Sequence, residues 1–160
     1  MTTTTETQKT ELRNRLQEVM DLHAAAALLR WDQETYMPPG GAPARGRQLA
    51  LLQRLAQERF TDAAIGCLLD ELQPYADSLP YDTDDAALIR VTRRQYERAS
   101  KVPPAFMAEM VQHGSTSYAL WAKARPANDF AAVQPCLEKM VVLSRRYADF
   151  SPTMPTPPIP

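Results

Sequence analysis

Apolar side chains recur at spacings of three and four residues along most of this chain, and this period constrains the fold more than any other feature. Such spacing aligns side chains along one side of an α-helix, whereas a half-buried β-strand alternates apolar and polar residues. No stretch of the sequence shows the two-residue alternation. We therefore expect an all-α fold, a bundle of about six amphipathic helices, in residues 1–150.

Breaks in this pattern mark the expected helix boundaries. The first helix should run from Glu11 to about Trp31, because the prolines and glycines of residues 38–43 cannot continue it. A second helix should begin at about Ala44, and a third should follow an N-cap at Thr61 and end before a connection between Pro74 and Pro80. A fourth helix should be capped by Asp82, Thr83 and Asp84, a fifth should begin at Pro103-Pro104, and a sixth should be capped by Asn128 or Asp129. The expected inner residues include Leu12, Val19, Met20, Leu49, Ala56, Ile65, Leu69, Leu72, Val91, Phe106, Trp121, Phe130, Leu137 and Val141.

Length and composition fit one globular domain. The chain has 160 residues, of which 44% are hydrophobic, so it can bury a substantial core. Lys and Arg number 18 against 19 Asp and Glu, and the net charge of −1 creates no field that would attract nucleic acid or anionic lipid. We expect neither a nucleic-acid partner nor a membrane.

The polar N-terminus lacks the apolar run of a signal peptide or membrane span, which favours a cytoplasmic protein.

Cys67 and Cys136 lie far apart in apolar helical contexts and are expected to be buried free thiols. Residues 151–160, SPTMPTPPIP, contain five prolines and should form an extended or disordered tail.

The sequence contains no recognisable catalytic or metal-binding motif. A helical zinc hydrolase places two imidazoles one turn apart in H-E-x-x-H, so that both reach one metal. The two histidines here, His23 and His113, lie on different expected helices without a second ligand at that spacing. A site assembled from both histidines and carboxylates is a minor alternative to two surface or partly buried imidazoles. We expect no catalytic residue and no metal ligand.

Two further groups have a functional and a structural interpretation. Arg90, Arg94 and Arg98 stack at four-residue spacing and could hold an anion, but such a stripe is more often a solvated helix face.

Asp32 could act as a general base, but the sequence shows no catalytic partner, nucleophile or metal site for it. The structural interpretation is favoured: Trp31 closes the apolar stripe of the first helix, and Asp32 and Gln33 bind backbone groups left open at its end.

Two segments carry a resemblance to a known family. LLRWDQETYMP, at residues 28–38, and a block that begins WAKARPANDF at residue 121 belong to a series of blocks that spans roughly residues 10–150. The most specific motifs within them are WDQ-x-T-x-M-P, at residues 31–38, and AR-x-x-NDF, at residues 124–130. With them, the chain resembles the carboxypeptidase Taq family of metallopeptidases. The residues that match its signatures, which we interpret as structural, are Trp31, Asp32, Gln33, Thr35, Met37, Pro38, Arg125, Asn128, Asp129 and Phe130.

The resemblance implies a metal-dependent exopeptidase that releases single residues from peptide C-termini, on a helical fold with a deep cleft, commonly as a homodimer. In that family an H-E-x-x-H helix and a later glutamate hold zinc or another divalent ion, which activates a water molecule. These motifs have no counterpart in the present sequence, so no catalytic or metal residue can be transferred, and no cofactor is expected in this chain.

We therefore expect the N-terminal helical wall or cap of such a carboxypeptidase cleft, inactive by itself. The abrupt change to a proline-rich end favours a truncated product over an independently evolved small protein. The alternative is a stand-alone helical dimerisation or interaction module. Expected partners are a second copy of the chain and, only in the full-length enzyme, peptide substrate. Assembly with a separate catalytic fragment is a further alternative.

Overall fold

The computed structural model describes residues 2–150, and every regular element in this range is a helix. The expected all-α fold is confirmed. The expected count of about six helices was slightly off. Residues 2–150 contain the α-helices α1 to α6 and, in addition, two short 3-10 helices, η1 and η2. The elements are α1 (Thr2–Thr35), η1 (Pro39–Gly41), α2 (Ala42–Phe60), α3 (Ala63–Asp77), α4 (Asp84–Ala99), α5 (Pro104–Ala124), η2 (Arg125–Ala127) and α6 (Phe130–Asp149).

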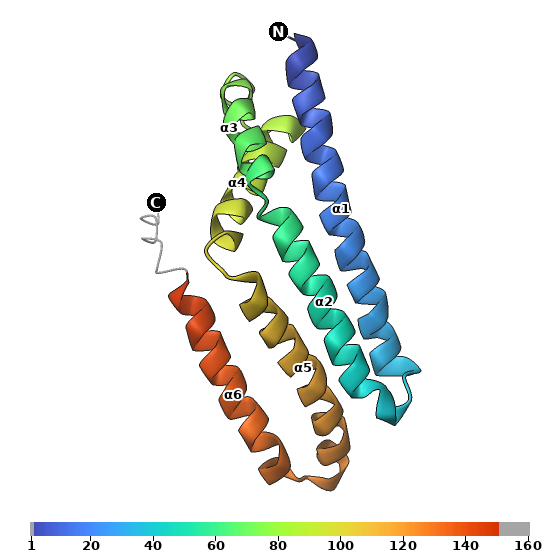
Figure 1. Ribbon diagram of the computed structural model, residues 1–160. Helices are drawn as coiled ribbons and strands as arrows, with labels where there is room; N and C mark the ends of the chain where they lie inside the picture. Colours follow the sequence, from blue (N-terminus) through green and yellow to red (C-terminus); the bar gives the residue numbers. More distant parts are fainter. Residues whose placement is uncertain (1, 151–160) are drawn as a thin grey trace.

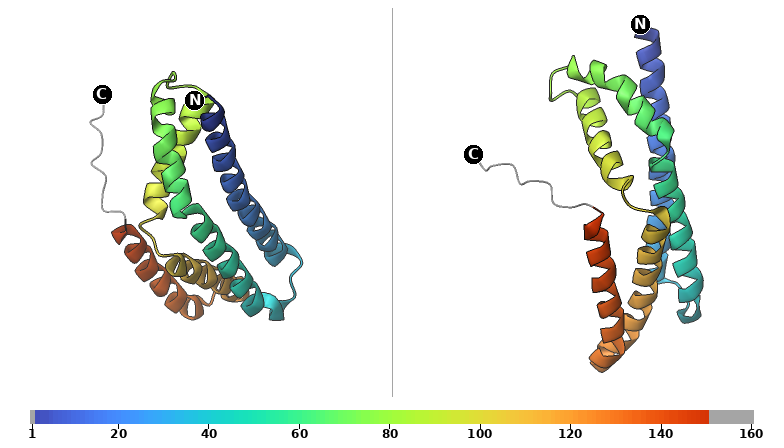
Figure 2. Two further views of the ribbon diagram at one scale, coloured as in Figure 1. Left: turned by 45° about the horizontal axis from the view of Figure 1, so that its top comes forward. Right: turned by 60° about the vertical axis from the view of Figure 1, so that its left-hand side comes forward.

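Four of the helices lie next to one another in a row, in the order α1, α2, α5 and α6 (Figure 1). The helix pair α3 and α4 packs against the N-terminal half of α1. Figure 2 shows that the α1–α2 and α5–α6 connections lie at the same end of the molecule, opposite the α3–α4 connection. The two segments that carry the family signatures are therefore at one end.

The main core lies where α1 meets α3 and α4. Leu12, Ile65, Leu69, Leu72 and Ile89 are at most 1% exposed. Their burial follows from the three- and four-residue spacing of each helix, which gives it one apolar side. A smaller core joins the start of α5 to α6 and consists of three buried residues and their neighbours, centred on Val102, Phe106 and Leu143.

A buried glutamine fixes the connection between α4 and α5. Gln57, on α2, donates from Nε2 to the carbonyl oxygen of Ala99 at 2.8 Å and to that of Val102 at 3.4 Å. These carbonyls lie at the end of α4 and in the loop after it, where intrahelical donors are missing. One side chain thereby holds the α4–α5 loop against α2.

A charged network joins α1 to α3 and α4. The Lys9 ammonium lies 2.7 Å from the Asp85 carboxylate and 2.8 Å from that of Glu6. Asp85 also accepts hydrogen bonds from Tyr75 Oη at 3.0 Å and from Arg13 at 2.7 Å. The hydrogen bond from Lys9 is the main cause that lowers the pKa of Asp85, and Lys9 has its own pKa raised chiefly by Asp85. The network is thus most stable with both groups ionised.

Several expected boundaries and exposures were wrong. The first helix begins at Thr2 and ends at Thr35, and the N-cap of α3 is Asp62, whose carboxylate accepts from the Ala64 amide at 2.8 Å. Thr61 instead donates to the Gln57 carbonyl oxygen. Pro74 lies inside α3, in its last turn, where the helix ends three residues later.

The pattern also assigned an inward position to some exposed residues, because it gives a helix an apolar face without showing what covers it. Met20, Val91, Phe130, Leu137 and Val141 are 40% exposed or more.

Both cysteines are free thiols. Cys67 is exposed and Cys136 is half-buried, so the expectation of buried thiols was wrong for Cys67. The expected tail, residues 151–160, lies outside the described residues. Within residues 2–150, no helix combines the length and apolarity needed to cross a bilayer.

The network predicts a specific loss of stability in acid. Because the folded pKa of Asp85 lies below its unfolded value, its contribution to folding is present above about pH 4 and disappears as the pH falls through the folded pKa. Asp85→Asn should lower the free energy of unfolding by about 1–2 kcal/mol at pH 7, a modest value because the side chain is 20% exposed. The difference from wild type should shrink below pH 4, as measured by urea unfolding.

Asp84→Asn is the matched control. Asp84 lies in the same first turn of α4 and shares the favourable effect of a negative charge there, but it is exposed and outside the network. It should cost less than 0.5 kcal/mol. Equal losses from the two substitutions would show that the helix terminus, and not the network, accounts for the effect.

Candidate functional site

The first signature segment forms the end of α1. The amides of Tyr36 and Met37 both donate to the Asp32 carbonyl oxygen at 2.9 Å, and Thr35 Oγ1 donates to the Trp31 carbonyl oxygen at 2.7 Å. These bonds satisfy carbonyls that the last turn leaves open. The backbone at this corner is therefore closed by its own amides and by Thr35, not by the side chains of Asp32 and Gln33.

Asp32 binds a guanidinium instead. Arg45 Nη2, on α2, lies 2.6 Å from Asp32 Oδ2, and Arg45 Nη1 donates to the Leu29 carbonyl oxygen. The Arg45 side chain is only 12% exposed. A carboxylate held in this ion pair links α1 to α2, which supports the structural interpretation of Asp32 over a general base.

Gln33 makes a reciprocal pair with α5. Its Nε2 donates to the Ser115 carbonyl oxygen at 3.2 Å, while Ser115 Oγ donates to Gln33 Oε1 at 2.8 Å. Ser115 is 7% exposed and Gln33 is half-buried, so the pair is partly removed from water. The adjacent residues Asp32 and Gln33 thus attach the end of α1 to two different helices.

The remaining residues of this segment surround the turn into α2. Trp31 was expected to close the apolar stripe, but it is 54% exposed and meets Tyr36 edge to face, with ring centroids 5.5 Å apart. Met37 lies over Gly41, where an added Cβ would come within 2.9 Å of Met37 Cγ. The Pro38 carbonyl oxygen accepts from the Gly41 amide at 2.8 Å. A larger residue at position 41 would therefore require the Met37 side chain to shift.

The second signature segment joins α5 to α6. Asn128 adopts φ 53°, a left-handed conformation that asparagine tolerates better than most residues. Asp129 is the N-cap of α6, and its carboxylate accepts from the Ala132 amide at 3.1 Å. Of the two expected caps, Asp129 is the one that binds the helix.

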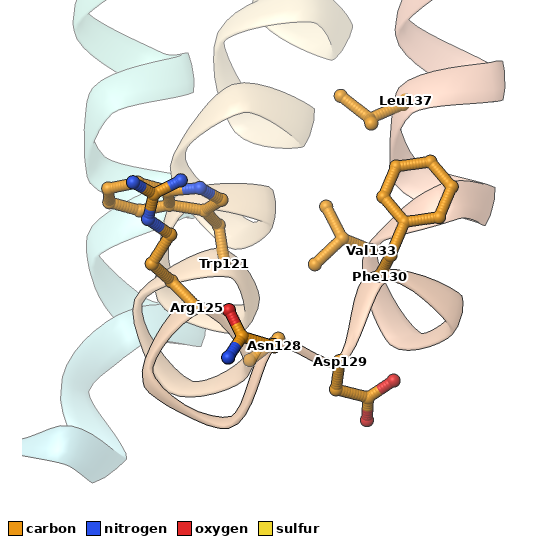
Figure 3. Close-up of a pocket in the computed structure, with 8 residues that line it drawn as sticks. Trp121, Arg125, Asn128, Asp129, Phe130, Val133 and Leu137 are labelled. Carbon is orange, nitrogen blue, oxygen red and sulfur yellow. The ribbon is translucent and has the colours of Figure 1, made fainter.

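A pocket of about 360 Å³ opens beside this connection (Figure 3). Trp121 and Arg125 approach it from the end of α5 and from η2, while Phe130, Val133 and Leu137 approach it from α6. The carboxylate of Asp129 points away from it. Sequence reasoning grouped Arg125, Asn128 and Phe130 as a signature, but did not predict that they line a pocket with Trp121.

Comparison of the sequence with models of known protein families identifies the family. The family described as carboxypeptidase Taq (M32) metallopeptidase matches residues 11–156. The chain belongs to this M32 family. The match includes residues 151–156, so the expectation that the resemblance ends near residue 150 was wrong.

Individual M32 relatives agree with the assignment. Thermostable carboxypeptidase 1 of Thermus thermophilus is 34% identical over 143 residues, which are 88% of this chain and 28% of the relative. Carboxypeptidase 1 of Bacillus subtilis is 27% identical over 135 residues, 84% of this chain and 26% of the relative. The chain therefore spans little more than a quarter of these M32 proteins.

Solved structures give the same picture. The crystal structure of the M32 carboxypeptidase from Deinococcus radiodurans R1 is 40% identical, with a TM-score of 0.63, and the match covers 91% of this chain and 29% of that one. The BsuCP crystal structure has a TM-score of 0.86 at 24% identity, covering 94% and 30% of the two chains, which supports the fold alone.

The M32 family is metal-dependent, but the side chains described here do not fit a metal centre. Within residues 2–150, no group of three or more His, Cys, Asp or Glu side chains is arranged to hold a metal ion. His23 is exposed on α1, whereas His113, on α5, donates from Nε2 to the Cys136 carbonyl oxygen at 3.0 Å. The two imidazoles do not form one site, and no step of metal chemistry can be derived from these residues.

Two arginines of α4, Arg90 of the stripe and its neighbour Arg93, make local contacts. Arg90 lies over the Tyr81 ring, with 3.7 Å from its Cζ to the ring centroid, and donates to the Tyr81 carbonyl oxygen at 3.0 Å. Arg93 binds Gln73 at 2.9 Å and Asp70 at 2.8 Å on α3. These contacts agree with a solvated face that stabilises the α3–α4 pair.

The Gln33–Ser115 pair predicts coupled effects on stability. Gln33→Leu should lower the free energy of unfolding by about 1–3 kcal/mol, because it leaves the buried Ser115 hydroxyl without its acceptor. Ser115→Ala should cost a similar amount. The double variant should cost clearly less than the sum, since removing both partners leaves no unsatisfied group. Urea unfolding of the four proteins measures the coupling, and strictly additive losses would contradict it.

Proposed function

We propose that this chain forms the N-terminal helical wall or cap of the substrate cleft in a metal-dependent carboxypeptidase that removes C-terminal residues from peptides. The observation that carries the proposal is the family match over residues 11–156, together with relatives that the chain covers by only 26% to 28% of their length. The chemistry of the whole enzyme then belongs to residues that this segment does not match.

The contribution of this segment is to position helices. Its two signature segments lie at one end of the molecule, and Gln33 attaches the first of them to α5. Arg45 fixes the same segment to α2 through Asp32. A rigid helical wall of this kind suits the orientation of a peptide beside a catalytic centre that other residues provide.

The alternative of a stand-alone dimerisation or interaction module finds no support in the comparisons, which instead match most of the chain to metallocarboxypeptidases. Zinc as the metal and association into a homodimer stay predictions. The exposed apolar side chains of α6 favour self-association, because large apolar surfaces on soluble proteins commonly mark contacts with other protein.

A chimeric enzyme tests the proposal. Residues 11–150 of this chain would replace the matching segment of the Thermus thermophilus thermostable carboxypeptidase 1, and release of C-terminal amino acids from short peptides would be measured. We expect the chimera to keep activity that a chelator removes. A well-folded but inactive chimera, checked by its thermal unfolding, would contradict the proposed role.

The separate chain supplies the complementary experiment. Purified by itself and given zinc or cobalt, it should release no C-terminal amino acid, because its sequence holds no H-E-x-x-H segment and only two histidines. The intact Thermus thermophilus enzyme is the positive control. Turnover by the separate chain that disappears with a chelator would refute the expectation of inactivity.

A further inference from the structure

A groove of about 590 Å³ lies between α1 and α4, and it shares no residue with either signature segment. Its apolar residues recur at three- and four-residue spacing along both helices, so each helix turns one side toward the same space. They are Leu16, Val19 and Met20 of α1, Leu88 and Val91 of α4, and Phe60 at the end of α2. This volume falls within the range of small-molecule sites, which is about 300–1,000 Å³.

Thr92 supplies a buried hydroxyl that has no partner in the described part of the chain. Thr92 is 4% exposed and lines the groove. Its Oγ1 makes no hydrogen bond within residues 2–150, yet no side-chain oxygen or nitrogen there is both enclosed and unsatisfied. The hydroxyl is therefore not sealed inside protein, and the space that it reaches is the groove. A ligand that displaces water from this space must hydrogen-bond the hydroxyl in its place.

The walls of the groove favour an aromatic ligand. Val19 is 6% exposed, whereas Met20 is 61% exposed and Val91 40%, so the groove has a buried floor and an open apolar rim. Phe60 meets Tyr96 edge to face, with ring centroids 6.4 Å apart, and also lines the groove. A phenyl ring and a flexible thioether both pack well on a further aromatic ring. Such a ring would remove the exposed rim from water.

The charges of the groove disfavour an anion. Its ionisable side chains, His23 and Asp84, are both exposed, and the described lining includes no lysine or arginine. A negative ligand would meet the Asp84 carboxylate without a compensating cation. We propose that the groove binds a small neutral aromatic molecule, with its ring between Met20 and Phe60 and one hydrogen-bonding group on Thr92 Oγ1.

This site goes beyond the proposed role of a cleft wall, because it rests on the groove alone and needs neither a peptide nor a metal. A ligand in it contacts α1 and α4 at once. Because the unfolded chain has no such groove, binding should also stabilise the folded state. Binding and stabilisation are both measured without turnover, so their failure would leave the activity of the chimera as an independent result.

A fluorescent probe gives a direct test. The probe is 2-naphthol, which is neutral and carries one hydroxyl, and its own fluorescence is followed as the intact chain is added. The control is 2-naphthoate, which has the same rings and a negative charge. We expect saturable binding of 2-naphthol with a Kd on the order of 0.1 mM, and binding of 2-naphthoate at least about tenfold weaker. Equal binding of the two probes would overturn the preference for a neutral ligand.

Thr92→Val tests the hydrogen bond, since it removes the hydroxyl and keeps the branched shape. It should weaken binding of 2-naphthol about fivefold. It should not lower the midpoint of thermal unfolding, because the hydroxyl has no hydrogen bond in the protein to lose. Thr10→Val makes the same change at an exposed residue of α1 outside the groove, and binding should stay unchanged. Unaltered binding by Thr92→Val would overturn the role of Thr92.

Val91→Glu places a carboxylate on the rim of the groove and should weaken binding of 2-naphthol at least about fivefold. Val142→Glu is its matched control, because Val142 is an exposed residue of α6 outside the groove, and it should have no effect. Equal effects of the two variants would overturn the assignment to this groove. Light scattering identifies another occupant: a dimer that Val91→Glu dissociates, with no binding of 2-naphthol, would show that a second copy covers the groove and would overturn the proposal.

Discussion

Small residues let α2 lie close to its two neighbours, and the arrangement of the other helices depends on this approach. Gly46 is buried, and a Cβ added there would lie 3.4 Å from Thr116 Cγ2 on α5. Ala42, Ala50 and Ala56 are buried on the same helix. Because the distance between packed helices depends on the side chains at their contact, these residues allow α1, α2 and α5 to form one continuous row.

This close packing explains how the first signature segment contacts two helices at once. With α2 and α5 near the end of α1, Asp32 reaches Arg45 and Gln33 reaches Ser115. Neighbouring residues on a helix point in different directions, so two consecutive polar side chains can hold two different helices.

The surface of α6 links the fold to the family assignment. Phe130, Leu137 and Val141 follow the apolar spacing expected of an inner stripe, yet all three are exposed, and Leu143 is the residue of α6 that is buried against α5. The relatives are more than three times as long as the matched segment. Within residues 2–150 this apolar face of α6 stays uncovered, and the matched relatives contain many residues beyond the segment that aligns with this chain.

Sequence by itself determined the all-α class, the main core residues Leu12, Ile65, Leu69 and Leu72, and the family, because helical spacing and local motifs depend on nearby residues. Only the tertiary structure decided which partners meet. The Lys9–Asp85 pair and the Gln33–Ser115 pair join residues far apart in sequence, and the pocket forms where two helices end. Such contacts depend on how helices pack, and a helical period specifies an apolar face without specifying the surface that covers it.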